Sequence, residues 1–161
     1  MAEHIKKEVS LTILSAAELS KGQTELVKQA KEAAKKAYSP YSNFQVGAAL
    51  RLKDGSIVRG NNQETSSYPT GLCAERVAIF AANAANPDAE YTSIAITAKK
   101  TESSEFISVT PCGSCRQVLS EYEVKQDKPI EVIMAGDDGK YYISDSIETL
   151  LPFSFSSKYL K

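Results

Sequence analysis

The segment GLCAERVAIFAAN, residues 71–83, carries the pattern that decides the fold of this chain of 161 residues. Apolar residues at helical spacing predict a helix over about 73–85, but Cys73, Glu75 and Arg76 occupy its first turn. Residues two apart on a regular helix point about 200° away from each other, so Cys73 and Glu75 can share a site only if Cys73 lies at the irregular start of the helix. The segment therefore predicts a buried helix whose N-terminus carries chemistry.

A second predicted helix begins with the other two cysteines of the chain. The segment TPCGSCRQVLSEYE, residues 110–123, is predicted to be helical with Thr110 as its N-cap. Cys112 and Cys115 are three residues apart, which places both sulfurs on one face of that helix. Helix N-termini favour thiolates, the form of cysteine that binds zinc, and three protein ligands leave a fourth position for water. We therefore predict one catalytic zinc ion per chain, bound by Cys73, Cys112 and Cys115.

Length and composition predict one globular domain over residues 1–161, with 42% hydrophobic and 24% charged residues. The formal net charge of -1 provides no broad basic field for nucleic acid, so we expect a small-molecule substrate. No signal peptide or membrane-spanning run is recognisable, which favours a cytoplasmic protein. Three cysteines are a poor basis for a disulfide framework, and His4 is the single histidine, which excludes a metal site with two histidines.

Predicted strands and helices alternate along the chain. Strands are expected on both sides of the Asp-Gly turns at residues 54–55 and 138–139, and another strand at 91–99. Helical spacing also covers about 26–37, and EVSLTIL, residues 8–14, is interpreted as an added edge strand or a subunit contact. The alternation predicts an α/β domain with an antiparallel hairpin in its sheet.

Each motif has an alternative interpretation. Cys112 and Cys115 alone could form a thioredoxin-like redox pair, and Cys73 alone could be a core residue. A zinc-stabilised binding protein without hydrolytic activity is a further hypothesis, but a purely structural site gains nothing from Glu75. Arg76 is either a surface charge or a donor to sulfur that offsets thiolate charge.

Taken together, CAER and PCGSCRQ are similar to motifs of the zinc-dependent cytidine deaminases, specifically their small homotetrameric branch with an all-cysteine zinc site. AYSPYSNFQVGAAL, GNNQET, CAERVAIF, PCGSCRQVLSEY and LLPFSFS occur in the family's order, so the resemblance covers residues 28–157. It implies a three-layer α/β/α cytidine deaminase-like domain with a mixed five-stranded sheet. Residues 1–20 would then form an N-terminal extension with an extra strand, and residues 150–161 a C-terminal tail at a subunit interface.

The resemblance also implies a reaction, the hydrolytic deamination of cytidine and deoxycytidine to uridine and deoxyuridine in pyrimidine salvage. Glu75 would be the catalytic residue that carries protons between a zinc-activated water and the base. Arg76 and Gln117 would lie beside the zinc ligands. The alternative is a deaminase of another small aminopyrimidine, such as a blasticidin-like antibiotic or a nucleotide.

Five residues would bind the nucleoside within one chain according to this resemblance. Phe44 would pack against the pyrimidine, and the backbones of Ala74 and Thr110 would bind the base. Asn62 and Glu64 would bind the ribose 3'-hydroxyl. These two are two residues apart and would point the same way on a strand, although two solvated polar residues leaving a hairpin give the same pattern.

Neighbouring subunits of a homotetramer would complete the site with the Ser66 backbone, Tyr68 and Phe155. The alternative for the tail is that Phe153 and Phe155 cover the core of their own domain. The sequence departs from the family's pattern beside the predicted sugar-binding residues, where altered sugar contacts are expected. The departures are at Asn61, Thr65, Ser66 and Ser67.

Overall fold

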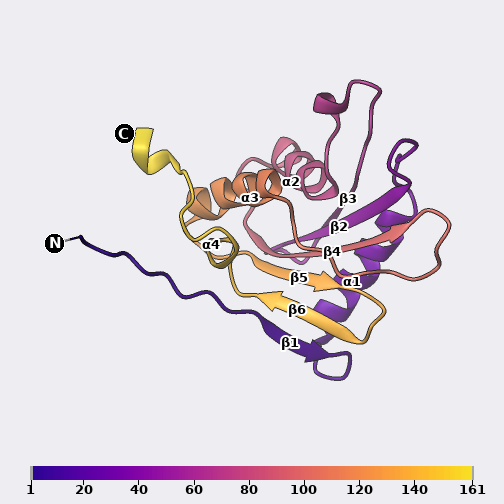
Figure 1. Cartoon of the computed structure of the whole chain (residues 1–161), viewed down its shortest axis with the longest axis horizontal. Helices are drawn as coiled ribbons and strands as arrows, with labels where there is room; N and C mark the ends of the chain where they lie inside the picture. The colour runs from indigo at the N-terminus through magenta and orange to yellow at the C-terminus, as the bar shows by residue number, and fades with distance from the viewer. Residues whose placement is uncertain (1, 161) are drawn as a thin grey trace.

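The computed structural model describes residues 2–160, which form one sheet of six strands and four α-helices (Figure 1). The strands lie in the order β1-β6-β5-β4-β2-β3, in which β4 and β5 pair in parallel and the other neighbours pair antiparallel. The elements are β1 (Thr12–Ser15), α1 (Lys21–Ala34), β2 (Phe44–Leu52), β3 (Ile57–Asn61), η1 (Tyr68–Thr70), α2 (Ala74–Ala85), β4 (Tyr91–Lys100), α3 (Gly113–Gln126), β5 (Glu131–Ala135), β6 (Lys140–Ser144), α4 (Ile147–Leu150) and η2 (Ser157–Leu160).

The predicted α/β class is confirmed, but the prediction of five strands is wrong. The sixth strand is β1, which pairs antiparallel with β6 at the edge of the sheet and places Thr12 opposite Ile143. Leu14 from β1 packs against the core, whereas Ile13 remains 57% exposed. The N-terminal segment thus adds an amphipathic edge strand to the sheet.

Side chains of the central strands alternate between two buried clusters, as the two-residue period of a strand requires. Ile94 and Ile96 of β4 pack with residues of α2 and α3, including Leu119. Ala95 of the same strand packs with Leu26 and other residues of α1. Helix α1 therefore covers one face of the sheet, and α2 and α3 cover the other (Figure 1). Within residues 2–160, no helix combines the length and apolar character that a membrane crossing needs.

The starts of α1 and α3 differ from those predicted from the sequence. A capping box of Ser20 and Gln23 begins α1 earlier than the predicted residue 26. The prediction of Thr110 as the cap of α3 is wrong, because that helix begins at Gly113 with Cys112 as its N-cap. The backbone of Cys112 is extended, with φ of -66° and ψ of 166°, so the helix starts two residues later than Thr110 would allow.

Helix α2 packs directly against the backbone of β3 at Gly60. A Cβ atom added at Gly60 would lie 2.2 Å from the carbonyl oxygen of Ala74 and 2.6 Å from the backbone nitrogen of Ala78. Only a residue without a side chain fits between these elements. This close approach fixes the first turn of α2, which follows Cys73 and carries Glu75, against the sheet.

We expect Gly60→Ala to lower the free energy of unfolding by about 1–3 kcal/mol, because the added methyl group pushes α2 away from β3. Urea unfolding followed by circular dichroism measures this change. Gly22→Ala is the matched control, since the nearest atom to its added Cβ would be the Ser20 Oγ at 3.9 Å. The control should keep or slightly raise stability, because alanine is favoured over glycine in a helix. Equal stability of the two variants would contradict the packing described here.

Candidate active site

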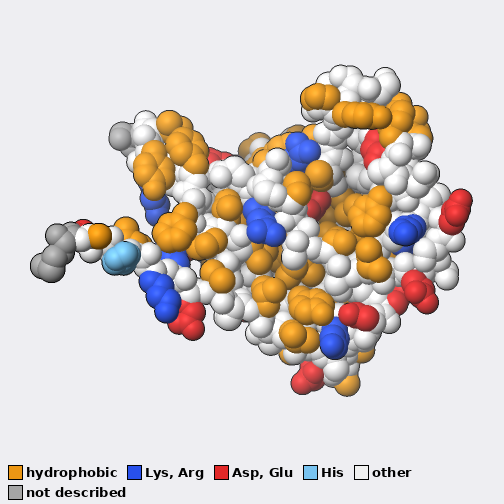
Figure 2. Space-filling model, in the orientation of Figure 1, with side chains coloured by type: hydrophobic (Ala, Val, Ile, Leu, Met, Phe, Trp, Pro, Cys, Tyr) orange, Lys and Arg blue, Asp and Glu red, His pale blue; other side chains and the backbone are white. Residues whose placement is uncertain are grey.

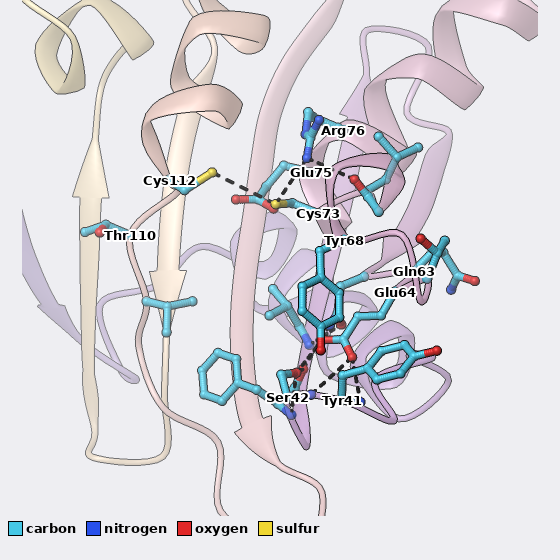
Figure 3. A pocket seen from close by; sticks show the side chains of 17 residues that line it. Tyr41, Ser42, Gln63, Glu64, Tyr68, Cys73, Glu75, Arg76, Thr110 and Cys112 are labelled. Carbon is cyan, nitrogen blue, oxygen red and sulfur yellow. Dashed lines mark hydrogen bonds between the residues drawn. The ribbon is translucent and has the colours of Figure 1, made fainter.

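The three cysteines meet where α2 and α3 begin. Cys73 is the N-cap of α2 with an extended backbone, φ of -71° and ψ of 155°, which meets the geometric condition for sharing a site with Glu75. Cys112 is the N-cap of α3, and Cys115 is buried in the first turn of that helix. Their Sγ atoms all lie within 4.8 Å of one another. Those of Cys73 and Cys112 are 3.9 Å apart, as Figure 3 shows for these two residues.

The spacing and chemistry of this thiol cluster fit one zinc ion per chain. Two sulfurs bound to one tetrahedral zinc at about 2.3 Å each lie about 3.8 Å apart, close to the separation of Cys73 and Cys112. All three cysteines are free thiols, and two of them cap helices, where the positive end of the helix dipole stabilises thiolates. Three ligands leave a fourth coordination position open for a water molecule.

Hydrogen bonding within the cluster favours the thiolate form of Cys73. A hydrogen bond from Cys115 and the nearby Arg76 guanidinium lower the pKa of Cys73 to about 5, against the opposing effect of burial. The same hydrogen bond and burial raise the pKa of Cys115. The Nη2 of Arg76 lies 3.6 Å from the Cys73 Sγ and 3.5 Å from the carbonyl oxygen of Gly71. Arg76 is therefore a partner of sulfur and not a surface charge.

Glu75 lies beside the cluster in a buried position. Its side chain is 4% exposed, and burial raises the pKa of its carboxyl group, helped by the negative charge of Cys73. A carboxyl group with a raised pKa exchanges protons near neutral pH more readily than an ordinary glutamate. Both features suit Glu75 to acid-base chemistry beside the thiol cluster.

A cavity of about 690 Å³ opens over Glu75 and the cysteines. Its walls include four of the five residues that the resemblance implies bind the nucleoside within one chain. Helix starts and the segment before α3 form one end, and the loop before β2 and the exit of β3 form the other (Figure 3). The lining contains Phe44, Asn62, Glu64 and Thr110, together with Tyr41, Ser42, Gln63, Tyr68, Cys73, Glu75, Arg76 and Cys112.

The two predicted sugar-binding residues are held by backbone groups. Asn62 is 9% exposed, and its amide accepts a hydrogen bond from the Val46 N–H at 2.8 Å and donates to the Phe44 carbonyl at 2.9 Å. The Glu64 carboxylate accepts from the backbone N–H groups of Tyr41 at 3.0 Å and Ser42 at 3.2 Å, and from the Ser42 hydroxyl. Although its partial burial opposes them, these donors keep the pKa of Glu64 below its usual range.

Tyr41 and Ser42 are cavity residues that the sequence analysis did not single out. They stand in the polar stretch SPYSN, whose composition is that of an ordinary loop. Their contact with Glu64 joins residues 22 and 23 positions apart and mostly uses backbone N–H groups. The remaining signal is the unusual backbone of Asn43, with φ of 52°, which only the structure reveals.

Ala74, Ser66 and Gln117 lie outside the cavity lining. Ala74 is the first residue of α2, where a helix leaves backbone N–H groups without intrahelical partners. Ser66 is exposed on the loop between β3 and α2. The side-chain amide of Gln117 donates to the carbonyl oxygen of Phe155 at 2.7 Å, which ties α3 to the tail.

Tyr68 and Phe155, the two aromatic residues predicted to contact substrate in a neighbouring subunit, lie in different places relative to the cavity of their own chain. Tyr68 lines the cavity of its own chain, is 73% exposed, and packs edge-on against Tyr41 with ring centroids 5.6 Å apart. Phe155 lies in the tail, is 58% exposed, and stacks on Tyr159 with centroids 5.7 Å apart. Within one chain, therefore, Phe155 does not line the cavity.

Comparisons with known proteins agree with this geometry. A family model described as the cytidine and deoxycytidylate deaminase zinc-binding region matches residues 20–127. The cytidine deaminase of Halalkalibacterium halodurans is 40% identical over 133 residues, which are 83% of this chain and 93% of that protein. The blasticidin-S deaminase of Bacillus cereus is 29% identical over 142 residues, 86% of this chain and 95% of that protein.

The fold is shared with solved structures as well. The crystal structure of cytidine deaminase from Burkholderia pseudomallei has 41% sequence identity and a TM-score of 0.70, and the match covers 82% of this chain and 98% of that chain. The family match spans both helix starts and all three cysteines, so the thiol cluster fits the one zinc ion per chain that this zinc-binding family implies. With relatives alike over most of both chains, this protein belongs to the family of zinc-binding cytidine and deoxycytidylate deaminases.

Proposed function

We propose that this enzyme hydrolyses cytidine and deoxycytidine to uridine and deoxyuridine, with release of ammonia, as a step of pyrimidine salvage in the cytoplasm. The observation that carries the proposal is the buried carboxyl group of Glu75 beside three clustered thiols at one end of the cavity. A structural zinc site has no use for such a carboxyl group, whereas hydrolytic deamination needs a proton carrier there. The names of the cytidine deaminase relatives support cytidine as the substrate.

Glu75 is the proton carrier in this proposal. When bound by the three thiolates, zinc supplies the Lewis acidity that makes a water molecule nucleophilic near neutral pH. Glu75 accepts a proton as the water adds to C4 of the base, and passes it to ring N3. Glu75 then delivers the second proton of the water to the exocyclic amine, which leaves as ammonia. Its raised pKa suits both the uptake and the release of these protons.

Arg76 moderates the charge of the zinc site. Three thiolates around one divalent zinc ion leave a net charge of about -1, which weakens the metal as a Lewis acid. The Arg76 guanidinium lies 3.6 Å from the Cys73 Sγ and withdraws negative charge from that sulfur. Gln117 is assigned an indirect part, because its amide holds the tail and not a zinc ligand.

Opposite ends of the cavity bind the base and the sugar in this proposal. The Ala74 N–H and the Thr110 carbonyl bind the base, while Phe44 packs against the pyrimidine ring. Asn62 and Glu64 bind the ribose 3'-hydroxyl from the far end of the cavity. A clamp on a free 3'-hydroxyl favours a sugar that is unesterified at that position, and so a free nucleoside over a polynucleotide chain.

We also propose a homotetramer in which the Ser66 backbone, Tyr68 and Phe155 reach the substrate of a neighbouring subunit. Phe153 and Phe155 are 68% and 58% exposed, so they do not cover the core of their own domain. Apolar side chains gather on the C-terminal segment and on the projecting loop between β3 and α2 (Figure 2). Exposed aromatic groups at two such projections favour burial against other subunits.

We expect Glu75→Gln to retain zinc and thermal stability while kcat for cytidine falls by about 10²-fold or more, because proton transfer is lost at several steps. The loss of cytidine absorbance measures the rate, with deoxycytidine, cytidine monophosphate and blasticidin S tested in parallel. Glu102→Gln is the matched control at an exposed position and should leave the rate unchanged. Near-normal turnover by Glu75→Gln would exclude the role of Glu75 as proton carrier. A wild-type preference for blasticidin S would contradict the proposal that cytidine is the substrate.

Metal analysis tests the zinc site without relying on activity. We expect one zinc per wild-type chain, and far less in Cys112→Ala, because the remaining two thiols bind the ion much more weakly. The cysteines of the wild type should react slowly with a thiol reagent, and they should react faster after a chelator has removed the zinc. Ser114→Ala, between the two α3 cysteines, is the control that should keep its zinc. Active wild-type protein with no zinc, or with a disulfide between Cys112 and Cys115, would contradict the site.

Sedimentation tests the tetramer. We expect the intact chain to sediment as a tetramer, and a chain ending at residue 152 to dissociate with a KM raised by about tenfold or more, because a buried aromatic contact is lost. Phe155→Ser is the milder variant and should raise KM while the tail remains present. A fully active wild-type monomer at micromolar concentration would rule out the shared site.

A further inference from the structure

The loop before β2 surrounds the Glu64 carboxylate with hydrogen-bond donors. The Ser42 hydroxyl donates to Oε1, and the backbone N–H groups of Tyr41 and Ser42 donate to Oε2 at 3.0 Å and 3.2 Å. Figure 3 shows Tyr41 and Ser42 next to Glu64 at one end of the cavity. Ser42 is the one side chain in this set of donors, so it is the part of the set that a substitution can remove.

The number of donors limits what Glu64 can still accept. A carboxylate has about four acceptor positions on its two oxygens. Two N–H groups occupy Oε2, and the Ser42 hydroxyl occupies one position on Oε1. One acceptor position of Oε1 is left for a ligand in the cavity, and the Ser42 hydroxyl fixes the direction in which that position points.

The loop is anchored well enough to hold this arrangement. The Tyr38 N–H donates to the Asn62 carbonyl at 3.0 Å, and the Glu64 N–H donates to the Tyr38 carbonyl at 2.9 Å. Asn43 adopts the left-handed conformation with φ of 52°, and its carbonyl accepts from the Thr101 N–H at 2.9 Å. The turn at Asn43 brings Ser42 back toward β3, so its hydroxyl meets Glu64 without a conformational change.

Ser42 also connects the carboxylate to the base-binding side of the cavity. Its Oγ accepts a hydrogen bond from the Phe44 N–H at 3.1 Å, and the Phe44 carbonyl accepts from the Asn62 amide at 2.9 Å. The hydroxyl of Ser42 therefore acts as acceptor toward Phe44 and donor toward Glu64. Three residues proposed to bind substrate, Phe44, Asn62 and Glu64, form one hydrogen-bonded unit through β2 and Ser42.

We propose that Ser42 is a positioning residue, which directs the free acceptor position of Glu64 toward the 3'-hydroxyl of the bound nucleoside. This inference rests on the proposed function, since it needs a nucleoside in the cavity. It assigns Ser42 a role in ground-state binding of the sugar. The residue does not contact the reacting atoms, which lie at the other end of the cavity beside Glu75.

The test compares cytidine with 3'-deoxycytidine, which lacks the hydroxyl group that Glu64 would accept. In the wild type, KM should be lower for cytidine. We expect Ser42→Ala to raise KM for cytidine by about tenfold, the usual worth of a hydrogen bond to a charged group, with kcat changed far less. KM for 3'-deoxycytidine should stay nearly constant, because the Glu64 oxygen has no partner on that nucleoside.

Three controls separate this role from a merely structural one. Ser42→Thr keeps the hydroxyl group, so its KM for cytidine should stay close to the wild-type value. Ser104→Ala is at an exposed position outside the cavity lining and should behave as the wild type. Zinc content and melting temperature should be the same in all variants.

The outcomes also distinguish the two proposals. If the wild type deaminates cytidine but Ser42→Ala raises KM equally for both nucleosides, lowers only kcat, or has no effect, the role of Ser42 is overturned and the proposed function stands. If the zinc-loaded wild type deaminates neither nucleoside, both proposals fail. Failure of Ser42→Thr to recover KM would also contradict a role for the hydroxyl group.

Discussion

The convergence of three thiols from two helix starts is the constraint on which the rest of this structure depends. Cys73 and Cys112 are 39 residues apart in the chain, yet their sulfurs lie 3.9 Å apart. Thiolates this close repel one another, so a divalent cation and the Arg76 guanidinium stabilise the arrangement. Helix α2, which begins directly after Cys73, lies against the backbone of β3 at Gly60. The packing of α2 on the sheet therefore also positions Cys73 and Glu75 at the thiol cluster.

The cavity combines two rigid ends that come from different kinds of backbone. Helix N-termini supply the end with sulfur ligands and unpaired N–H groups, which suit a metal and a polar base. The other end is built from the anchored loop before β2 and the exit of β3, where Asn62 and Glu64 are already hydrogen-bonded. In the proposed function, these two ends bind the sugar and the base of one nucleoside, so the distance between them sets where C4 lies relative to Glu75.

The parts of this structure that follow local rules could be predicted from the sequence, and the parts set by distant contacts could not. The Asp-Gly turns predict both hairpins, and the position of Cys73 before an apolar run predicts its place at the start of α2. Residues 8–14 were interpreted as an edge strand or a subunit contact, and only the pairing of β1 with β6, about 130 positions away, distinguishes the two. Tyr41 and Ser42 were missed because backbone N–H donors leave no signature in the side-chain pattern. Residue type favours Thr110 as the cap, but the helix begins after Cys112, whose side chain makes no capping hydrogen bond, so backbone conformation decides the start.

Two carboxyl groups in one cavity show how environment assigns different roles to the same residue type. Glu75 is buried beside thiols, and burial raises the pKa of its carboxyl group, so it can hold and release a proton during a reaction. Glu64 is surrounded by three donors that lower its pKa, so it stays ionised and serves as a fixed acceptor. In the proposed function, Glu75 takes up and releases protons, which its raised pKa favours, and Glu64 accepts a hydrogen bond from the sugar, which its lowered pKa favours. The two carboxyl groups therefore differ in pKa because backbone N–H groups donate to Glu64, whereas Glu75 is buried beside thiols.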